Sequence, residues 1–330
     1  MIDSSQWLEM QKRLGPRGRL GIAARLFDPD GQAQDEIGFN ADDPFPMASV
    51  VKIPVGILAA SRVQSGEFSP DEEIRIDPLL LSPGVARSPI DHLFFYPFEI
   101  IRTETLDRLL GFMIQRSDNT SSDVLLHKLG GVSAVNAFLD DLGIRGIHFN
   151  RTLAQLVTFY YDLRLPAGRR PHIGQILSAI HRLRHPFACR EVREDALIHS
   201  GEDCCTPRAM AGLLTVLAKD RKYDLAYSHM QRCAGGRGRI RKGLAGHMGF
   251  IQTFGHKTGS LGGIANDAGI IRFADGSFAA ICIMTCRSSA PMEIRDRQIA
   301  AITAAIIRRF LRLPIAEADR RGRDPDSGFR

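Results

Sequence analysis

No stretch of this sequence reaches the roughly 18 consecutive apolar residues that a membrane-spanning helix needs. The N-terminal stretch, MIDSSQWLEMQKRLGPRGRL, also has no apolar core of the kind that a secretory signal peptide carries. We therefore expect a cytoplasmic protein with no membrane partner.

Cysteine spacing that would indicate a metal site or a disulfide framework is missing as well. Cys204 and Cys205 are adjacent, and adjacent cysteines rarely bridge each other. Cys282 and Cys286 share one face of an expected strand, which does not make a ligand loop. We predict reduced thiols and no zinc site.

Aromatic residues are absent from the two most basic stretches, GRGRIRK at 236–242 and RRGRDPDSGFR at 320–330, apart from one phenylalanine near the end of the second. Proteins that bind single-stranded nucleic acid interleave such charges with aromatic side chains on which the bases stack. The formal net charge of +6 is modest for this length. We interpret both stretches as solvated surface and expect no nucleic-acid partner.

Length and composition are those of a soluble globular protein, with 330 residues of which 44% are hydrophobic and 24% charged. Apolar runs bounded by turn residues predict strands near both ends, and helical periodicity predicts helices between them. The expected strands are 19–28, a returning strand toward Ile37 and Phe39, 266–273 and 277–285. The expected helices are 4–14, 49–65, 105–116, 119–128, 133–142, 172–184 and 292–312.

Strands at both ends of the chain imply one sheet assembled from distant segments. We predict an α+β fold in which an antiparallel sheet packs against helices beside an all-helical region. The predicted organisation is a single domain over residues 1–313, with a helical insertion near 158–200 and a disordered tail over 314–330.

A serine and a lysine interrupt the apolar stretch MASVVKIPV at 47–55. On a helix, Ser49 and Lys52 lie on the same face at i and i+3, close enough for the amine to reach the hydroxyl. A base within hydrogen-bond reach activates a serine nucleophile, provided that burial leaves the lysine amine neutral. The alternative is that Ser49 caps the helix and the side chain of Lys52 extends from it to solvent.

Two further triplets decide between these alternatives. SDN at 117–119 lies between two expected helices, and KTG at 257–259 precedes the late hairpin. S-x-x-K, S-D-N and K-T-G in this order resemble the motif set of class A β-lactamases and penicillin-recognising serine enzymes. The resemblance extends over roughly residues 17–313, including CTPRAMAGLL at 205–214, and implies the β-lactamase/transpeptidase sandwich.

The resemblance also implies roles for the motif residues. Ser49 attacks an activated carbonyl and forms an acyl-enzyme, while Lys52 takes or relays the proton. Ser117 bridges Lys52 and Lys257 and passes the proton to the departing nitrogen. Asn119 resembles the residue that holds the side-chain amide of the substrate. Asp118 is expected to hold the turn.

The KTG strand is expected to recognise the substrate. Lys257, Thr258, Gly259 and Ser260 resemble the family's carboxylate-recognition strand, which implies a small-molecule acyl donor bearing a carboxylate. The oxyanion is expected between the backbone N–H groups of Ser49 and Ser260. His256 points to the opposite face of that strand, because neighbours on a strand alternate. No cofactor or metal is implied.

The sequence departs from the family at the deacylating glutamate. Class A enzymes carry an E-x-x-L-N motif downstream of S-D-N, and an ungapped count reaches LAQLV at 153–157. Leu153 stands at the glutamate position and Val157 at the asparagine position. A missing general base typically costs about 10²–10⁴ in rate. The next carboxylates are Asp162, Glu191, Glu194, Asp195, Glu202 and Asp203, which we interpret as surface groups, with a substitute base as the alternative.

A second departure lies between Ser82 and Ser117, where we interpret VARSPIDHLFFYPFEII as added residues near the rim of the pocket. Its aromatic residues, Phe94, Phe95 and Tyr96, either wall the substrate side or belong to the core.

Three functions remain open on this reasoning. The first is a β-lactamase-like hydrolase in which water clears the acyl group from Ser49. The second is a cytoplasmic acyltransferase that passes the group to an amine or alcohol, and the third is a slowly turning over acyl-binding protein or sensor. The missing glutamate and the missing export signal favour the second and third, whereas the intact triplets favour the first. A cell-wall D,D-peptidase is a weaker fourth.

Overall fold

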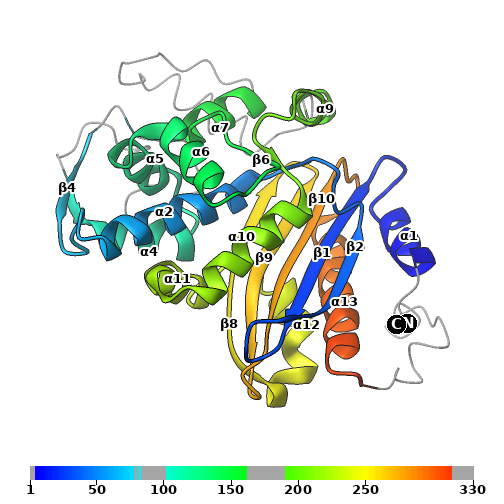
Figure 1. Ribbon diagram of the computed structural model, residues 1–330. Helices are drawn as coiled ribbons and strands as arrows, with labels where there is room; N and C mark the ends of the chain where they lie inside the picture. Colours follow the sequence, from blue (N-terminus) through cyan, green and yellow to red (C-terminus); the bar gives the residue numbers. More distant parts are fainter. Residues whose placement is uncertain (1–3, 78–79, 81, 83–101, 162–189, 314–330) are drawn as a thin grey trace, which may run out of the picture.

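The computed structural model describes residues 4–77, 80, 82, 102–161 and 190–313. Its core is an antiparallel sheet of five strands in the order β2-β1-β10-β9-β8 (Figure 1). The strands are β1 (Arg19–Phe27), β2 (Ala33–Phe39), β8 (Ile251–Leu261), β9 (Ile264–Phe273) and β10 (Phe278–Cys286). The predicted antiparallel sheet and the α+β class are therefore confirmed.

Both faces of this sheet are covered by helices, so β10 in its middle is buried along its whole length. On one face lie α1 (Ser4–Lys12), α12 (Ile240–Leu244) and α13 (Met292–Phe310). The predicted apolar stripe of α13, which includes Ile299, Ile302 and Ile306, packs there. On the other face lies α10 (Pro207–Lys219), which begins after the cap residue Thr206.

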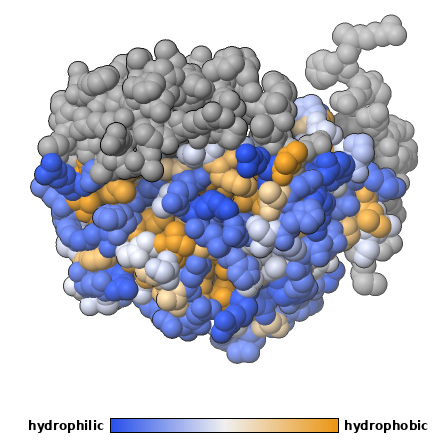
Figure 2. Space-filling view, turned by 90° about the horizontal axis from the view of Figure 1, so that it is seen from above, coloured by the Kyte–Doolittle hydropathy of each residue, from blue (hydrophilic) through white to orange (hydrophobic). Residues whose placement is uncertain are grey.

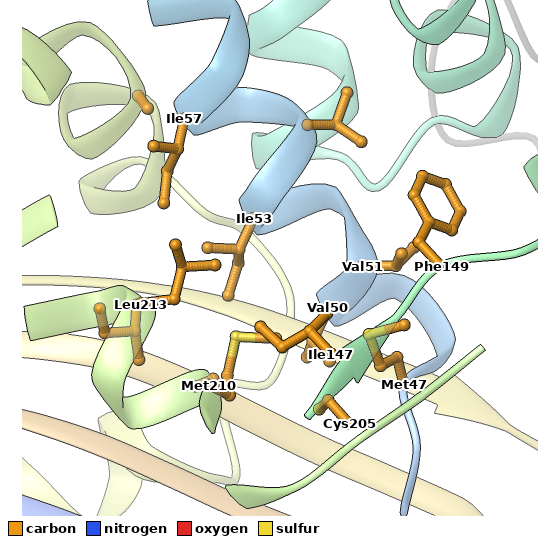
Figure 3. Close-up of a cluster of buried hydrophobic side chains, with 14 of the residues drawn as sticks. Met47, Val50, Val51, Ile53, Ile57, Ile147, Phe149, Cys205, Met210 and Leu213 are labelled. Atoms are coloured by element: carbon orange, nitrogen blue, oxygen red, sulfur yellow. The ribbon is translucent and has the colours of Figure 1, made fainter. Parts of the chain in front are cut away.

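A helical region stands beside the sheet (Figure 1). It contains α2 (Lys52–Gln64), α4 (Leu106–Gln115), α5 (Asn119–Lys128), α6 (Gly131–Asp141), α7 (Leu153–Tyr161), α9 (Arg190–Ser200) and α11 (Asp224–Gln231). Its centre is α2 with the short turn before it. Val50 and Val51 in that turn, and Ile53 and Ile57 in α2, pack against apolar side chains from other elements, including Met210 (Figure 3). Burial of this helix on all sides fixes the position of the residues just before it.

Two small sheets were not predicted. One joins β3 (Phe45–Pro46), β7 (Cys204–Cys205) and β6 (Ile147–His148), and the other pairs β4 (Glu73–Ile76) with β5 (Arg102–Thr105). Two-residue strands are too short to produce an alternating pattern, so the sequence could not indicate the first of them.

An ion pair closes the long segment between residues 151 and 203. The Arg151 guanidinium lies 2.6 Å from the Asp203 carboxylate, which also accepts the backbone N–H groups of Asn150 and Arg151. The ends of the segment that contains the expected insertion are thus held together.

Within the described ranges, no helix combines the length and the apolar character needed to cross a membrane. The described residues that are visible in Figure 2 are mostly hydrophilic, with smaller hydrophobic areas between them. The five cysteines in these ranges are free and buried. The aromatic residues Phe94, Phe95 and Tyr96, the expected helix 172–184 and the expected tail 314–330 lie outside the described residues.

Candidate active site

Ser49 lies in a 3-10 turn, η1 (Ala48–Val51), that leads directly into α2. The backbone N–H of Lys52 donates to the carbonyl of Ser49, which places these residues one turn apart. The preceding residue, Ala48, has a φ of +46°, a left-handed conformation that is strained for alanine. The Ser49 side chain is half-buried and follows this strained turn.

Strand β8 passes very close to this turn. A Cβ atom at Gly259 would lie 3.0 Å from the backbone nitrogen of Ser49 and 2.8 Å from the carbonyl oxygen of Met47. Only glycine therefore lets β8 approach the candidate nucleophile at this distance.

The side chain of Lys52 is fully buried, and its amine nitrogen contacts three oxygen atoms. Its Nζ lies 2.6 Å from the carbonyl oxygen of Ser117, 2.7 Å from Oδ1 of Asn119 and 3.3 Å from the Ser117 hydroxyl. Hydrogen bonds of this kind offset the cost of removing an amine from water. Lys52 does not extend to solvent, so the alternative reading of its side chain is wrong.

The Ser117 hydroxyl lies between two lysines, because it is also 3.0 Å from Nζ of Lys257. Ser117 has a φ of +62°, and the turn is held by Asp118, whose carboxylate caps α5 by accepting the N–H of Ser121 at 2.5 Å. The structural role expected for Asp118 is confirmed. The structure thus brings residues from α2, the α4–α5 turn and β8 into one hydrogen-bonded chain.

A cavity of about 280 Å³ opens at the Ser117–Lys257 end of this chain. It is lined by Gln115, Arg116, Ser117, Cys233, Ala234, Gly235, Lys257 and Thr258. Lys257 is fully buried and also donates to the carbonyl of Thr258 at 2.8 Å. A cation at the base of a cavity is suited to an anionic group of a ligand.

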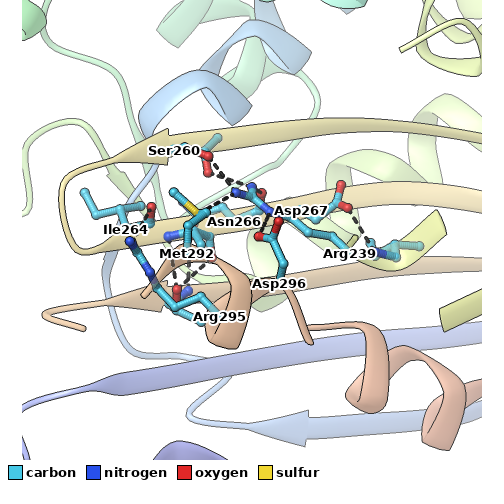
Figure 4. Close-up of polar contacts among 12 residues, drawn as sticks. Arg239, Ser260, Ile264, Asn266, Asp267, Met292, Arg295 and Asp296 are labelled. Atoms are coloured by element: carbon cyan, nitrogen blue, oxygen red, sulfur yellow. Dashed lines mark hydrogen bonds and ion pairs between the residues drawn. The ribbon is translucent and has the colours of Figure 1, made fainter. Parts of the chain in front are cut away.

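Arg239 is a site residue that the sequence did not reveal. Its guanidinium donates to the Ser260 hydroxyl at 2.7 Å and to the carbonyl groups of Gly259 and Asn266, and its Nε lies 2.7 Å from Asp296 (Figure 4). The interpretation of stretch 236–242 as solvated surface is wrong for this residue. No local signal distinguishes it from exposed arginines in the same stretch, because its burial depends on the distant strand β8.

His256 lies away from the lysine cluster, as alternation predicted. Its Nδ1 is 2.8 Å from the Asp267 carboxylate, and both side chains are fully buried. The other oxygen of Asp267 accepts the backbone N–H of Ile240, the residue after Arg239, at 3.2 Å. This pair therefore ties the chain that carries Arg239 to the back of β8.

Leu153, at the expected position of the deacylating glutamate, is the first residue of α7 and is buried. The carboxylate of Asp123, on α5, accepts the N–H of Leu153 at 2.7 Å and that of Ala154 at 2.8 Å, and also accepts the Ser82 hydroxyl. Asp123 lies one turn after Asn119, on the same face of α5. The sequence did not single it out, because an acidic residue within a helix usually faces solvent.

The downstream carboxylates have partners within the scaffold. Glu194 accepts the hydroxyl of Tyr160, Asp195 pairs with Arg17 and Arg287, and Glu202 and Asp203 pair with Arg151. Glu194 and Asp203 are buried, so the interpretation of the whole set as surface groups is wrong for these two. Asp162 and the side chain of Glu191 lie outside the described residues.

Burial raises the pKa of Asp123 from 3.8 to about 6, although its hydrogen bonds and the charge of Lys52 act in the opposite direction. The folded protein therefore binds this proton more tightly than the unfolded chain does. The resulting stabilisation is complete below about pH 4 and is lost as the pH rises through about 6.

Relative to an Asp123→Asn variant, the wild-type free energy of unfolding should fall by about 3 kcal/mol between those limits. Urea unfolding of both proteins between about pH 4 and about pH 6 measures this change. A difference in free energy of unfolding that stays constant with pH would contradict the raised pKa of Asp123.

A family model described as the β-lactamase enzyme family matches residues 16–310. Over 290 residues the chain is 25% identical to β-lactamase VEB-1 of Pseudomonas aeruginosa, covering 86% of this chain and 83% of that protein. Over 306 residues it is 22% identical to the β-lactamase regulatory protein BlaB of Streptomyces cacaoi, covering 88% and 92%.

Solved structures of class A β-lactamases share the fold. The last common ancestor of Gram-negative bacterial class A β-lactamases superposes with a TM-score of 0.68 at 25% identity, covering 93% of this chain and 98% of that one. A mutant of the chromosome-encoded β-lactamase of Vibrio parahaemolyticus gives a TM-score of 0.68 at 19% identity, covering 93% and 99%.

Proposed function

This chain belongs to the β-lactamase enzyme family and is a serine hydrolase of the class A type, and from this premise we propose that its reaction proceeds through an acyl-enzyme on Ser49. The acyl donor that we propose is a β-lactam or a related amide or ester. The observation that carries this proposal is the Ser117 hydroxyl lying between the buried amines of Lys52 and Lys257.

In the proposed acylation, a bond forms between Oγ of Ser49 and the carbonyl carbon of the donor, and the carbon–nitrogen bond then breaks. The hydroxyl proton passes through Lys52 and Ser117 to the departing nitrogen. The backbone N–H groups of Ser49 and Ser260 would hold the oxyanion.

Recognition of a carboxylate on the donor is proposed for β8 and its neighbour Arg239. Lys257 supplies a buried cation, and Thr258 and Ser260 supply hydroxyl groups. Arg239 adds a second cation within hydrogen-bond distance of Ser260. Asn119 would hold the amide of the acyl side chain.

Intact-protein mass, followed over time after mixing with a penicillin and separately with a small activated ester, tests this function. An adduct on the native protein that is absent from a Ser49→Ala variant is the expected result. If neither donor leaves an adduct nor is consumed, the proposed reaction is wrong for these classes of donor.

A Lys257→Ala variant should lose roughly 10- to 100-fold in acylation rate with donors that bear a carboxylate, which corresponds to one charge-assisted hydrogen bond. Uncharged esters should lose less, because they have no anion for Lys257 to bind. Second-order acylation rates for a matched pair of donors provide the measurement, with Lys242→Ala, an exposed lysine on α12, as the control. Equal losses for both donors would argue against the recognition role.

The second candidate is an acyltransferase or a slowly turning over sensor. It is favoured by Leu153 at the position of the deacylating base, and by the similarity to a relative that is named as a regulatory protein. An adduct that persists in water but disappears when amines or alcohols are added would support transfer. We propose the cytoplasm as the setting for either function.

A further inference from the structure

Helix α7 is hydrogen-bonded to two elements that carry candidate site residues, α5 and β8. Its first residues bind Asp123, on the same wall as Asn119 and Lys52. Near its other end, the hydroxyl of Tyr160 lies 3.5 Å from the carbonyl oxygen of Leu261, the residue after Ser260 on β8. A nine-residue helix of about 13 Å therefore runs from the α5 wall to the β8 wall.

The face that α7 buries is apolar. Its buried residues are Leu153, Leu156, Val157 and Tyr160, and the helix sequence LAQLVTFYY contains no carboxylate and no histidine. By the ungapped count, the residue at the position of the class A base is Leu153, the first residue of this apolar face. Such a surface offers a water molecule no group that could take its proton.

Both ends of α7 are fastened. At the first end, the Asp123 carboxylate accepts the N–H groups of Leu153 and Ala154. At the second end, the buried carboxylate of Glu194, on α9, accepts the hydroxyl of Tyr160 at 2.7 Å. In Figure 1, α7 and α9 lie together at the upper end of the sheet.

Glu194 also fastens α9 to the turn between β8 and β9. Its carboxylate accepts the N–H of Gly263 at 2.7 Å and that of Arg287 at 2.6 Å. A Cβ at Gly262 would lie 1.8 Å from the Tyr160 hydroxyl, and one at Gly263 would lie 2.9 Å from the Glu194 carboxylate. Only glycine at these two positions leaves room for the side chains of Tyr160 and Glu194. We call Tyr160, Glu194, Gly262 and Gly263 the α7 latch.

We propose that the α7 latch sets the lifetime of the acyl-enzyme by holding an apolar helix where water would otherwise attack. This inference rests on the proposed function. In the step concerned, a water oxygen bonds to the acyl carbon and the bond from that carbon to Oγ of Ser49 breaks. One water proton returns to Oγ, and the other leaves with the carboxylic acid product. Tyr160 and Glu194 are positioning residues, because they act on this step only through α7.

A Glu194→Gln variant tests the latch. The amide keeps one acceptor oxygen but presents an N–H donor to a backbone N–H, so one buried hydrogen bond is lost. We expect the adduct to disappear about tenfold faster, the change that loss of such a bond implies, with an unchanged acylation rate. Tyr160→Phe removes only the hydroxyl and should act in the same direction, which covers the case in which Glu194→Gln does not fold.

The matched control is Glu104→Gln. Glu104 lies on β5, away from α7, and its buried carboxylate pairs with Arg108 at 2.6 Å. Deacylation is followed by intact mass. Amide hydrogen exchange over residues 153–161 tests the latch without any donor. The exchange rate should rise about tenfold in the Glu194→Gln variant, rise also in Tyr160→Phe, and stay unchanged in Glu104→Gln. Unchanged exchange, an unchanged adduct lifetime or an equal effect in the control would overturn the latch. A native protein that neither forms an adduct nor consumes a donor would instead refute the proposed function.

Discussion

A Ser49→Ala variant is expected to take up no acyl group from any donor that labels the native protein. The methyl group of alanine cannot form a bond to the acyl carbon, and removing a catalytic serine of this kind costs on the order of 10⁶ in rate. Mass spectrometry of the intact variant, incubated beside the native protein, measures the effect directly. Labelling of the variant at full stoichiometry would remove Ser49 as the nucleophile.

The fold should survive this substitution. The Ser49 side chain is half-buried, and η1 does not depend on a side-chain cap. The melting temperature is therefore expected to stay close to the native value. Ser61→Ala, at the far end of α2, is the matched control and should label like the native protein.

Lys52→Arg should reduce the acylation rate by about 10³-fold, within the range for loss of a general base. Arginine keeps the positive charge and can donate to the Ser117 carbonyl and Asn119, but it remains protonated and cannot accept the proton of Ser49. Lys257→Arg should keep most of the activity, because recognition there requires only a cation. Quenched-flow mixing followed by intact-mass measurement gives the acylation rates of the two variants and separates the proton-accepting role of Lys52 from the recognition role of Lys257.

Native-like acylation by the Lys52→Arg variant would contradict a proton-accepting role. A Lys52→Met variant adds a second comparison, because it removes charge and base together. It leaves the Ser117 carbonyl and Oδ1 of Asn119 without this donor, so it should also unfold at a lower temperature. Loss of activity in both variants, with loss of stability mainly in the methionine variant, is the expected pattern.

Periodicity predicted several of the major elements, but it did not predict α10, α11 or the strand β8 that carries Lys257. The hairpin of β9 and β10 and the stripe of α13 follow from local alternation and helical spacing, and the structure confirms both. The pairing of β1 with β10 needed the further argument that strands at both chain ends share a sheet. Two-residue strands such as β6 and β7 carry no periodic signal and depend on tertiary contacts.

Motif spacing placed the candidate nucleophile and its lysines, whereas the surrounding shell needed the fold. Arg239 looks like one surface arginine among several, and Asp123 like an ordinary helical carboxylate. Each acquires its position from a partner far along the chain, Ser260 for Arg239 and Leu153 for Asp123. Hydrogen bonds between residues so far apart in the sequence cannot be predicted from the pattern of neighbouring residues.

The pairing of β1 with β10 has a consequence for biosynthesis. Arg19 on β1 lies opposite Cys286 on β10, so β1 can pair early with β2 but must wait for residues up to 286 to leave the ribosome before it pairs with β10. Ser49 and Lys52 come soon after the hairpin of β1 and β2, whereas Lys257 and strands β8 to β10 are synthesised much later. A nascent chain or one terminated before β8 therefore holds the candidate nucleophile without Lys257, and reactivity arises only after strands β8 to β10 have been synthesised.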